Sequence, residues 1–286
     1  MSILDLFLFL AGLGLLVMGA ELLVRGSTRL GELAGLSPLV VGLTIVSFAT
    51  TAPEATVSIT AASSGRGELA LGNVLGSNIF NMLVVVGAAA LITALPVSPI
   101  TVRKDVPVLI IGTAVVLLFA INGEVAKWEA VLMLLALVAF ISFSVWQSRR
   151  DSHPTAGSMI RRTRRAAMRE ISLGSTLGLG GAVLLVFGSR LFVDSASTIA
   201  EELGVSELVV GLTVAAVGTS APELTTSIVA AVKGQTDVAV GNAIGASIIN
   251  LLGIVALSSL VSPGGLAVPP PCPSIADGRP FTDDGF

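Results

Sequence analysis

The sequence predicts an all-α, polytopic membrane protein composed of two halves of inverted topology. Three observations support this prediction: a low content of charge, long apolar runs along the whole chain, and an internal duplication. Of the 286 residues, 53% are hydrophobic and 12% are charged, which is about half the charged fraction of an average soluble domain. Apolar runs of about 18 residues or more are long enough to cross a hydrocarbon core of about 30 Å.

Eight apolar segments are expected to cross the membrane. The first follows "MSILD", which contains no Lys or Arg and carries Asp5, so we expect a retained helix and not a signal peptide. The single Cys272 and the single His153 exclude an internal disulfide, a cysteine cluster and a paired-histidine metal site. The eight segments lie near residues 4–24, 37–62, 69–95, 105–121, 126–147, 172–193, 206–232 and 238–262.

The distribution of Lys and Arg predicts which way the chain crosses the membrane. With the amino terminus outside, twelve of these residues fall on the inner side and four on the outer side. Trp128 and Trp146 are about 27 Å apart along a helix, so each can lie in one interfacial belt. We therefore expect a multi-pass protein of the cell (inner) membrane. The basic segment 148–170 is expected to be a solvated cytoplasmic loop, with a regulatory or anionic-lipid contact as the alternative.

The chain contains an internal duplication. Residues 35–87 align without a gap onto residues 204–256 at an offset of 169, with 26 identities in 53 positions. Five spans separate equivalent helices, so the two copies enter the membrane from opposite sides. Inverted repeats of this kind are typical of secondary transporters, whose binding sites lie at the midplane where broken helices of both halves meet.

The duplication predicts four regions. The second half has no counterpart of spans 4 and 5, so the last two helices are expected to be missing or divergent. The polar, proline-rich sequence after about residue 264 favours a truncation or a frameshift. The expected regions are 1–147 (first transmembrane repeat, helices 1 to 5), 148–170 (basic loop), 171–262 (second repeat, helices 6 to 8) and 263–286 (tail outside the membrane).

Two similar motifs, "TTAPEAT" and "TSAPELT", place the carboxylates Glu54 and Glu223 inside apolar spans. An ionised group at the bilayer centre is unfavourable by about 2.5–3.5 kcal/mol on insertion scales, so it usually marks a functional pathway. Pro53 and Pro222 lack an N–H and leave backbone carbonyls one turn upstream without their helical donor. Such carbonyls are tolerated at membrane depth only within protein or along a hydrated cavity. The motifs therefore predict an oxygen-lined cation site.

The next span of each half, "GNVLGSNIFN" or "GNAIGASIIN", repeats polar and small residues at intervals of four. Residues four apart share one face of a helix, so the polar face is expected to converge on the two glutamates. The glycines form a stripe that is expected to allow close helix approach. The polar positions are Asn73, Ser77, Asn81, Asn242 and Asn250, and the glycines are Gly72, Gly76, Gly241 and Gly245.

The predicted donors suit hard cations. Calcium takes 6 to 8 oxygen ligands, which two carboxylates, two amides and backbone carbonyls can supply, and two carboxylates neutralise one divalent ion. The same donors, divided among separate positions, suit several Na⁺ ions. Competition for shared carboxylates is a simple route to exchange. A single buried glutamate can instead be a protonated core residue, but two at matching repeat positions argue against this.

These two pairs of motifs resemble the alpha repeats of the calcium/cation antiporter superfamily, specifically its prokaryotic sodium/calcium exchanger branch, and the similarity covers about residues 1–262. The resemblance implies ten helices as two inverted five-helix repeats, with helices 1 and 6 as a sliding, gating pair. It implies that Glu54 and Glu223 are shared ligands of Ca²⁺ and Na⁺. The further ligands that it implies are Thr50, Thr51, Ser77, Asn81, Thr219, Ser220, Asn250 and the carbonyls of Ser47 and Ala216.

Two positions depart from the family pattern. Ala246 stands where the family often has a serine, and Asn250 stands where some members have an aspartate. The favoured function is exchange of Ca²⁺ for Na⁺ by alternating access at a midplane site. A Ca²⁺/H⁺ or K⁺-dependent antiporter is the alternative, and a cation channel is less favoured. We expect a monomer that contacts the lipid bilayer and inorganic cations, with no nucleic acid, no cofactor and no enzymatic activity.

Overall fold

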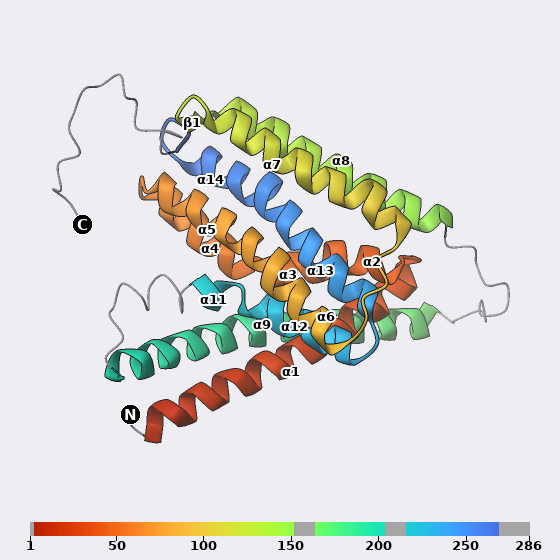
Figure 1. Cartoon of the computed structure of the whole chain (residues 1–286). Helices are drawn as coiled ribbons and strands as arrows, with labels where there is room; N and C mark the ends of the chain where they lie inside the picture. Colours follow the sequence, from red (N-terminus) through yellow and green to blue (C-terminus); the bar gives the residue numbers. More distant parts are fainter. Residues whose placement is uncertain (1–2, 152–163, 204–215, 269–286) are drawn as a thin grey trace, which may run out of the picture.

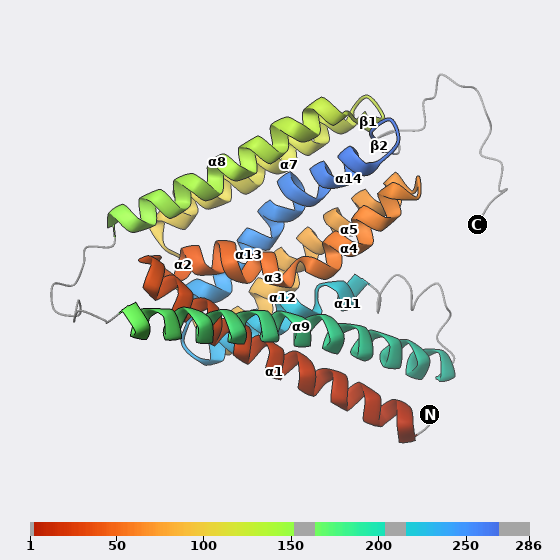
Figure 2. The same ribbon diagram turned by 180° about the vertical axis from the view of Figure 1, so that it is seen from behind.

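The computed structural model describes residues 3–151, 164–203 and 216–268, and these residues are mostly helical. The helices form three layers (Figure 1). Helix α1 (Ile3–Ala34) and helix α9 (Arg164–Glu202) lie side by side on one face, and the view from behind agrees (Figure 2). Helices α7 (Val106–Ala120) and α8 (Lys127–Asp151) cover the opposite face. Shorter, broken helices fill the layer between them.

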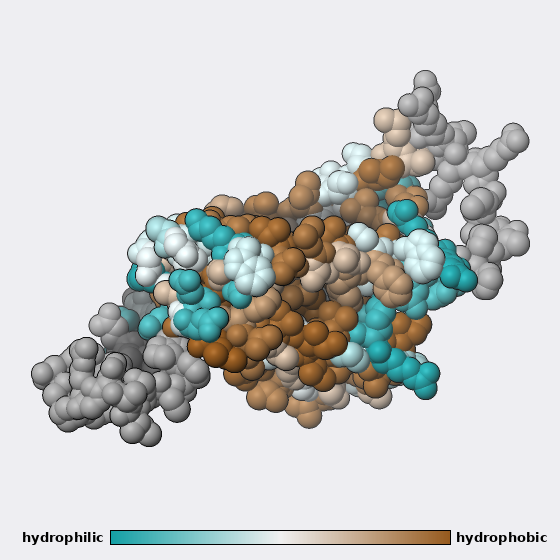
Figure 3. Space-filling view, turned by 90° about the horizontal axis from the view of Figure 1, so that it is seen from above, coloured by the Kyte–Doolittle hydropathy of each residue, from teal (hydrophilic) through white to brown (hydrophobic). Residues whose placement is uncertain are grey.

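The described part of the chain has the surface of a membrane protein. Five of its helices are long and apolar enough to cross a bilayer, and one bent pair of helices gives a sixth. Apolar side chains form a belt between polar ends on the face in Figure 3. Trp128 and Trp146 lie near the two ends of α8 and are 63% and 55% exposed, as expected for interfacial anchors. The predicted all-α, polytopic fold is confirmed.

Helices α1 and α9 pack through glycines and run antiparallel. A Cβ atom added to Gly12 would lie 2.6 Å from the Phe192 nitrogen, and one added to Gly19 would lie 2.8 Å from the Leu185 nitrogen. The contacts on α9 therefore move towards its start as the position on α1 advances. Small residues let the backbones of membrane helices approach closely. The antiparallel pair is the direct expression of the inverted duplication.

Both helices are longer than the predicted spans 4–24 and 172–193. An apolar run measures only the part of a helix that lies in hydrocarbon, and α1 continues until Gly35, whose φ of 69° ends the helix. The predicted loop 148–170 is correspondingly shorter, since α8 ends at Asp151 and α9 begins at Arg164. His153 lies between them, outside the described residues.

The second span of the first half is broken in the middle. Its two parts bend by 51° at Thr51, whose φ and ψ of −77° and 5° leave the helical region. The second half repeats this turn at Ser220, with φ and ψ of −92° and 5°. The elements are α2 (Pro38–Val41), the π-helix η1 (Gly42–Val46), α3 (Ser47–Thr50) and α4 (Ala52–Ser63), and then α11 (Ala216–Thr219) and α12 (Ala221–Val232).

The third span of each half contains a π-helical turn at the same place. All boundaries in this span coincide at the offset of 169 that aligns the two sequences. In the first half the elements are α5 (Gly67–Phe80), η2 (Asn81–Val85) and α6 (Val86–Ile92). In the second half they are α13 (Thr236–Ile249), η5 (Asn250–Ile254) and α14 (Val255–Val261). Such π turns occur often at functional sites.

Two short strands join the halves at one end of the molecule. Strand β1 (Glu124–Val125) pairs antiparallel with β2 (Leu266–Ala267), and Val125 and Leu266 are fully buried. Residues up to 268 therefore belong to the folded structure, although the sequence analysis begins the tail at residue 263. Strand pairing decides this, and a two-residue strand has no sequence pattern. Residues 269–286, which include Cys272, lie outside the described part. The π-helix η3 (Thr101–Asp105) precedes α7.

The equivalent third spans differ in their surroundings. In the most apolar window of Thr236–Val261, 83% of residues are buried, against 22% in Gly67–Ile92. A Cβ atom on Gly241 would lie 2.5 Å from the Leu39 carbonyl oxygen, and one on Gly245 would lie 2.6 Å from that of Leu43. These two glycines do allow close helix approach.

The described residues do not test the prediction for the other two glycines of the stripe. A Cβ atom on Gly72 or Gly76 would meet no atom of the described residues within 4 Å. These two glycines face no backbone in the described part of the chain. The repeat equivalents of the two leucines that face Gly241 and Gly245 are residues 208 and 212, which lie outside it.

The glycine contacts predict opposite effects of one substitution at two sites on α1. Gly26→Ala places a methyl group against the Gly178 nitrogen and 2.7 Å from the Gly174 carbonyl oxygen. We expect it to lower stability by about 1–3 kcal/mol through overpacking. Gly14→Ala meets no atom of the described residues within 4 Å and is expected to raise stability by up to about 1 kcal/mol through helix propensity. Thermal unfolding of both variants in detergent measures the difference, and equal shifts would contradict the packing described.

Candidate functional site

Two fully buried carboxylates lie at the centre of the molecule. Glu54 and Glu223 each have no exposed surface, and each lies in the first turn of a half-helix, α4 or α12, directly after the break in the span. The prolines before them occupy the start of these half-helices, where a missing N–H does not matter. The N-terminus of a helix carries a positive partial charge that favours a nearby carboxylate. Local chemistry thus explains how each acid is held at membrane depth.

The two halves meet at Glu54. The Ser220 hydroxyl of the second half donates a hydrogen bond of 3.0 Å to Glu54 Oε1. Among the described residues, Glu54 Oε2 and both carboxylate oxygens of Glu223 have no hydrogen-bond donor. Buried carboxylate oxygens normally have partners, so these three oxygens are available to a cation that enters the site.

Asn73 and Asn242 hold the half-helices in place. The Asn73 amide donates to the Ser58 hydroxyl at 2.9 Å and to the Glu54 backbone carbonyl at 3.4 Å. Asn242 repeats both bonds in the second half, to Ser227 at 3.0 Å and to the Glu223 carbonyl at 3.3 Å. Both asparagines therefore contact the backbone of a glutamate and not its carboxylate.

The two serines in this arrangement were missed from the sequence. Ser58 and Ser227 are both fully buried. The available signal is that each lies four residues after a site glutamate, and so on the same helix face, in both copies of the repeat.

The hydroxyls of the first motif turn back onto its own backbone. Thr50 Oγ1 donates to the Ser47 carbonyl at 3.2 Å and lies 3.1 Å from Asn242 Oδ1 of the other half. Thr51 Oγ1 donates to the same carbonyl at 2.8 Å, and the Thr51 N–H does so at 3.0 Å. A cation that binds the Ser47 carbonyl has to replace a hydrogen bond that a threonine hydroxyl donates to it. This turn then offers both the carbonyl and a hydroxyl oxygen.

The equivalent turn of the second half is partly described. Ala216 and Thr219 begin and end α11, at the repeat positions of Ser47 and Thr50, and Thr219 is half-buried. Ser220 is fully buried and occupies the repeat position of Thr51. Sequence-predicted residues of both motifs are thus brought to the two matching breaks.

Asn81 and Asn250 each open a π-helical turn and are fully buried. In the described part of the chain, neither polar atom of the Asn81 amide has a hydrogen-bond partner. Asn250 donates to Asn78 Oδ1 at 3.1 Å, and Asn78 donates to the Ser247 carbonyl at 3.2 Å. The Asn81 amide oxygen therefore has a free lone pair with which it can coordinate a cation inside the protein.

Asn78 is a contact residue that the sequence analysis missed. Its spacing of three from Asn81 was the available signal, since residues three apart also share a helix face. Ser77 is buried as expected, and Ala246 is buried at the equivalent position without a hydroxyl.

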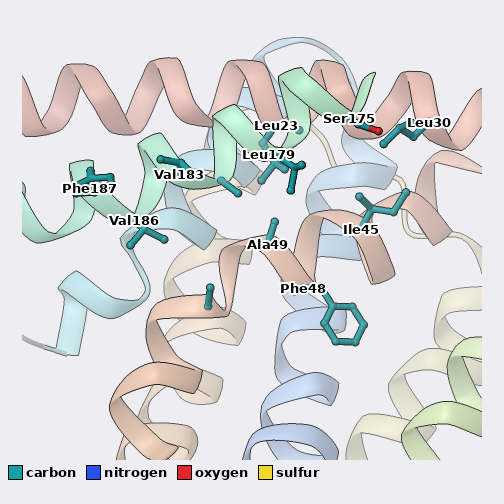
Figure 4. Close-up of a pocket in the computed structure, with 13 residues that line it drawn as sticks. Leu23, Leu30, Ile45, Phe48, Ala49, Ser175, Leu179, Val183, Val186 and Phe187 are labelled. Atoms are coloured by element: carbon teal, nitrogen blue, oxygen red, sulfur yellow. The ribbon is translucent and has the colours of Figure 1, made fainter. Parts of the chain in front are cut away.

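An apolar cavity of about 640 Å³ separates the α1–α9 pair from the broken span next to the site (Figure 4). Ile45, Phe48 and Ala49 line one side of it, and Leu179 and Val183 line the other. The layer formed by α1 and α9 is therefore not packed tightly onto the core at this depth.

A smaller cavity of about 230 Å³ lies between α9 and α4. Pro53 and Thr219 line its inner part, and Thr56, Arg190 and Asp194 line it further along. This cavity brings polar and charged side chains close to the break in both motifs.

Inverted halves with buried carboxylates at their broken helices define a secondary transporter of cations. Residues 4–146 and 175–275 match the family model described as sodium/calcium exchanger protein, and the chain belongs to this family of cation/Ca²⁺ antiporters. The resemblance inferred from the two motifs is thereby confirmed.

Individual relatives agree. The chain is 36% identical over 261 residues to the putative antiporter CaxA of Alkalimonas amylolytica. The alignment covers 89% of this chain and 80% of CaxA. It is 35% identical over 259 residues to the inner membrane protein YrbG of Escherichia coli (strain K12), which covers 90% of this chain and 80% of YrbG. A solved structure of the sodium-calcium exchanger NCX_Mj, soaked with 2.5 mM Na⁺ and 0.1 mM Ca²⁺, matches with a TM-score of 0.79 and 28% identity. The match covers 94% of this chain and 85% of that one.

The asparagine contacts predict unequal effects in the two halves. Asn242→Ala removes the bonds to Ser227 and Glu223 and the contact of Thr50 with the other half, at a fully buried position. We expect a loss of stability of about 1–3 kcal/mol, because buried polar groups lose their partners. Asn73→Ala lies at a half-buried position, and among the described residues the Asn73 amide donates only within the first half, so its effect should be smaller. Melting temperatures in detergent test this order, and a larger loss for Asn73→Ala would contradict it.

Proposed function

We propose that this chain is a Ca²⁺:Na⁺ antiporter that works by alternating access at the site around Glu54 and Glu223. The observation that carries the proposal is the pair of fully buried carboxylates at inverted half-helix starts. Among the described residues, three of their four oxygens have no hydrogen-bond donor. Two ionised carboxylates balance the charge of one Ca²⁺. The same two groups can be shared among Na⁺ ions when Ca²⁺ is absent.

The remaining ligands follow from the same geometry. The Asn81 amide, Asn250 Oδ1 and the carbonyl and hydroxyl oxygens at the Thr50–Thr51 break supply the neutral oxygens that a hard cation needs. Ser77, Thr219, Ser220 and the carbonyls of Ser47 and Ala216 complete the proposed ligand set. Asn73 and Asn242 position the half-helices. The lack of a hydroxyl at Ala246 weakens one position for Na⁺.

Exchange follows from the charge of the site. When both carboxylates are ionised and no cation is bound, two negative charges lie together in a low-dielectric interior, where their repulsion is strong. This state is unfavourable to move across the membrane. Either Ca²⁺ or Na⁺ relieves the repulsion, so the α1–α9 pair moves with ions bound, and one ion type leaves only when the other enters.

The proposal extends to the arrangement of the chain in the cell. We assign repeats of residues 1–147 and 171–262, a cytoplasmic loop within 148–170, and the amino terminus outside. The excess of Lys and Arg on one side supports this orientation. The relative YrbG is an inner membrane protein, which supports the same location for this chain. A monomer contains both halves of the site.

Substitution of either glutamate tests the shared site. Glu54→Gln and Glu223→Gln halve the charge of the site, and each is expected to abolish Ca²⁺ uptake while leaving insertion intact. Glu68→Gln is the matched control, because Glu68 is an exposed carboxylate in the first turn of α5. Uptake of ⁴⁵Ca²⁺ into proteoliposomes measures all three. Wild-type uptake in either site variant would refute the shared site.

The coupling ion is tested with the unmodified chain. We expect ⁴⁵Ca²⁺ uptake to require Na⁺ inside the proteoliposomes and to cease when the Na⁺ gradient is replaced by K⁺ or choline. Uptake driven by a pH gradient alone would replace Na⁺ by H⁺ in the proposal. A further requirement for K⁺ would indicate the K⁺-dependent alternative. Uptake that needs no counter-ion would indicate a channel.

A further inference from the structure

Helix α1 is tied to the second half of the protein by an ion pair in its middle. The Glu21 carboxylate contacts the ammonium of Lys233, the residue directly after α12, and also the guanidinium of Arg25 on the next turn of α1. Glu21 and Lys233 are partly buried, with side chains 28% and 27% exposed, whereas Arg25 is 62% exposed. The contact between Glu21 and Lys233 therefore joins the α1–α9 layer to the half-helix that carries Glu223.

The turn that carries Lys233 is held by its own backbone. Gly234 adopts a φ of 72°, and the Gln235 N–H donates to the Ala230 carbonyl at 2.8 Å. This is the bonding of a capped helix end, which needs a left-handed residue such as glycine. Gln235 adds a second link to α1, since its Oε1 accepts a hydrogen bond of 3.4 Å from the Thr28 hydroxyl. Lys233 is thus presented from a fixed position.

The opposite end of the molecule lacks this tie. At the repeat offset, Arg190 on α9 corresponds to Glu21, Ser64 to Lys233 and Arg66 to Gln235. The acid is thus replaced by a base, and its basic partner by a serine. No ion pair between α9 and this turn occurs in the described ranges. Arg190 instead lines the 230 Å³ cavity that reaches Pro53 and Thr219. An ion pair therefore links α1 to the core at one end of the inverted repeat, whereas a cavity lies at the equivalent place of the other end.

We propose that the ion pair between Glu21 and Lys233 is a latch that keeps the α12 side of the transporter closed, and that it opens whenever the site faces that side. The proposal rests on the alternating access proposed above. Movement of the α1–α9 pair past α12 separates Glu21 from Lys233. The latch therefore biases the population towards the conformation with the cavity at α4. A partly exposed ion pair shifts such an equilibrium by about two- to fivefold.

A pair of repeat-equivalent cysteines reports the two sides. Thr56 lines the cavity beside α4, and Thr225 is its equivalent on α12, the half-helix that ends at Lys233. Thr56→Cys and Thr225→Cys are made separately in full-length Cys272→Ser protein in proteoliposomes, and modification by a charged methanethiosulfonate reagent is timed. Lys233→Gln and Glu21→Gln should each speed modification of Thr225→Cys by about two- to fivefold and slow that of Thr56→Cys. The double variant should have the effect of one single variant.

Arg25→Gln is the matched control, because it removes an exposed partner of Glu21 and leaves Lys233 in place. It should change neither rate. Unchanged rates in both latch variants, or additive effects in the double variant, would overturn the latch. Cysteine modification needs no Ca²⁺ transport, so a shift in accessibility without Na⁺-driven uptake would retain the latch and reject the proposed function. Normal Na⁺-driven uptake with unchanged accessibility would retain the proposed function and reject the latch.

Discussion

The structure is organised around the fully buried carboxylates of Glu54 and Glu223. A charged group inside a membrane is tolerated only where protein supplies polar partners. Here each glutamate sits at the start of a half-helix, and its backbone carbonyl is bonded to an asparagine of the next span. The breaks at Thr51 and Ser220 are the means by which helix ends reach membrane depth.

The two copies of the repeat share the arrangement around the glutamates and differ elsewhere. The same break, the same asparagine contacts and the same π turn recur in both halves. Elsewhere the two copies differ: the repeat position equivalent to Asn78 is a serine, and the one equivalent to Glu21 is an arginine. The conserved part of the repeat surrounds the charge, where both halves must meet one requirement. Of the parts that differ, Asn78 lies between the third spans of the two halves, and Glu21 lies where α1 contacts the end of α12.

The features that the sequence analysis missed have a common origin. Gly241 and Gly245 face the backbone at Leu39 and Leu43, and their spacing does not indicate which segment they face. Spacing defines a face, whereas the neighbour of that face is set by packing. The burial of Leu266 against β1 and the contact of Asn78 with Asn250 likewise depend on segments that are distant in the chain.

The sequence by itself determined the membrane class, the inverted duplication and the two acidic, proline-broken motifs. These depend on hydrophobic length, on the offset of 169 and on residues adjacent in the chain. Only the tertiary structure decided that Ser220 bonds Glu54, that the Ser47 carbonyl is already shared by two threonines, and that Lys233 reaches Glu21. The physical reason is that a hydrogen bond or an ion pair depends on distances of a few ångströms between helices, and the spacing of residues within one helix carries no information about its neighbour.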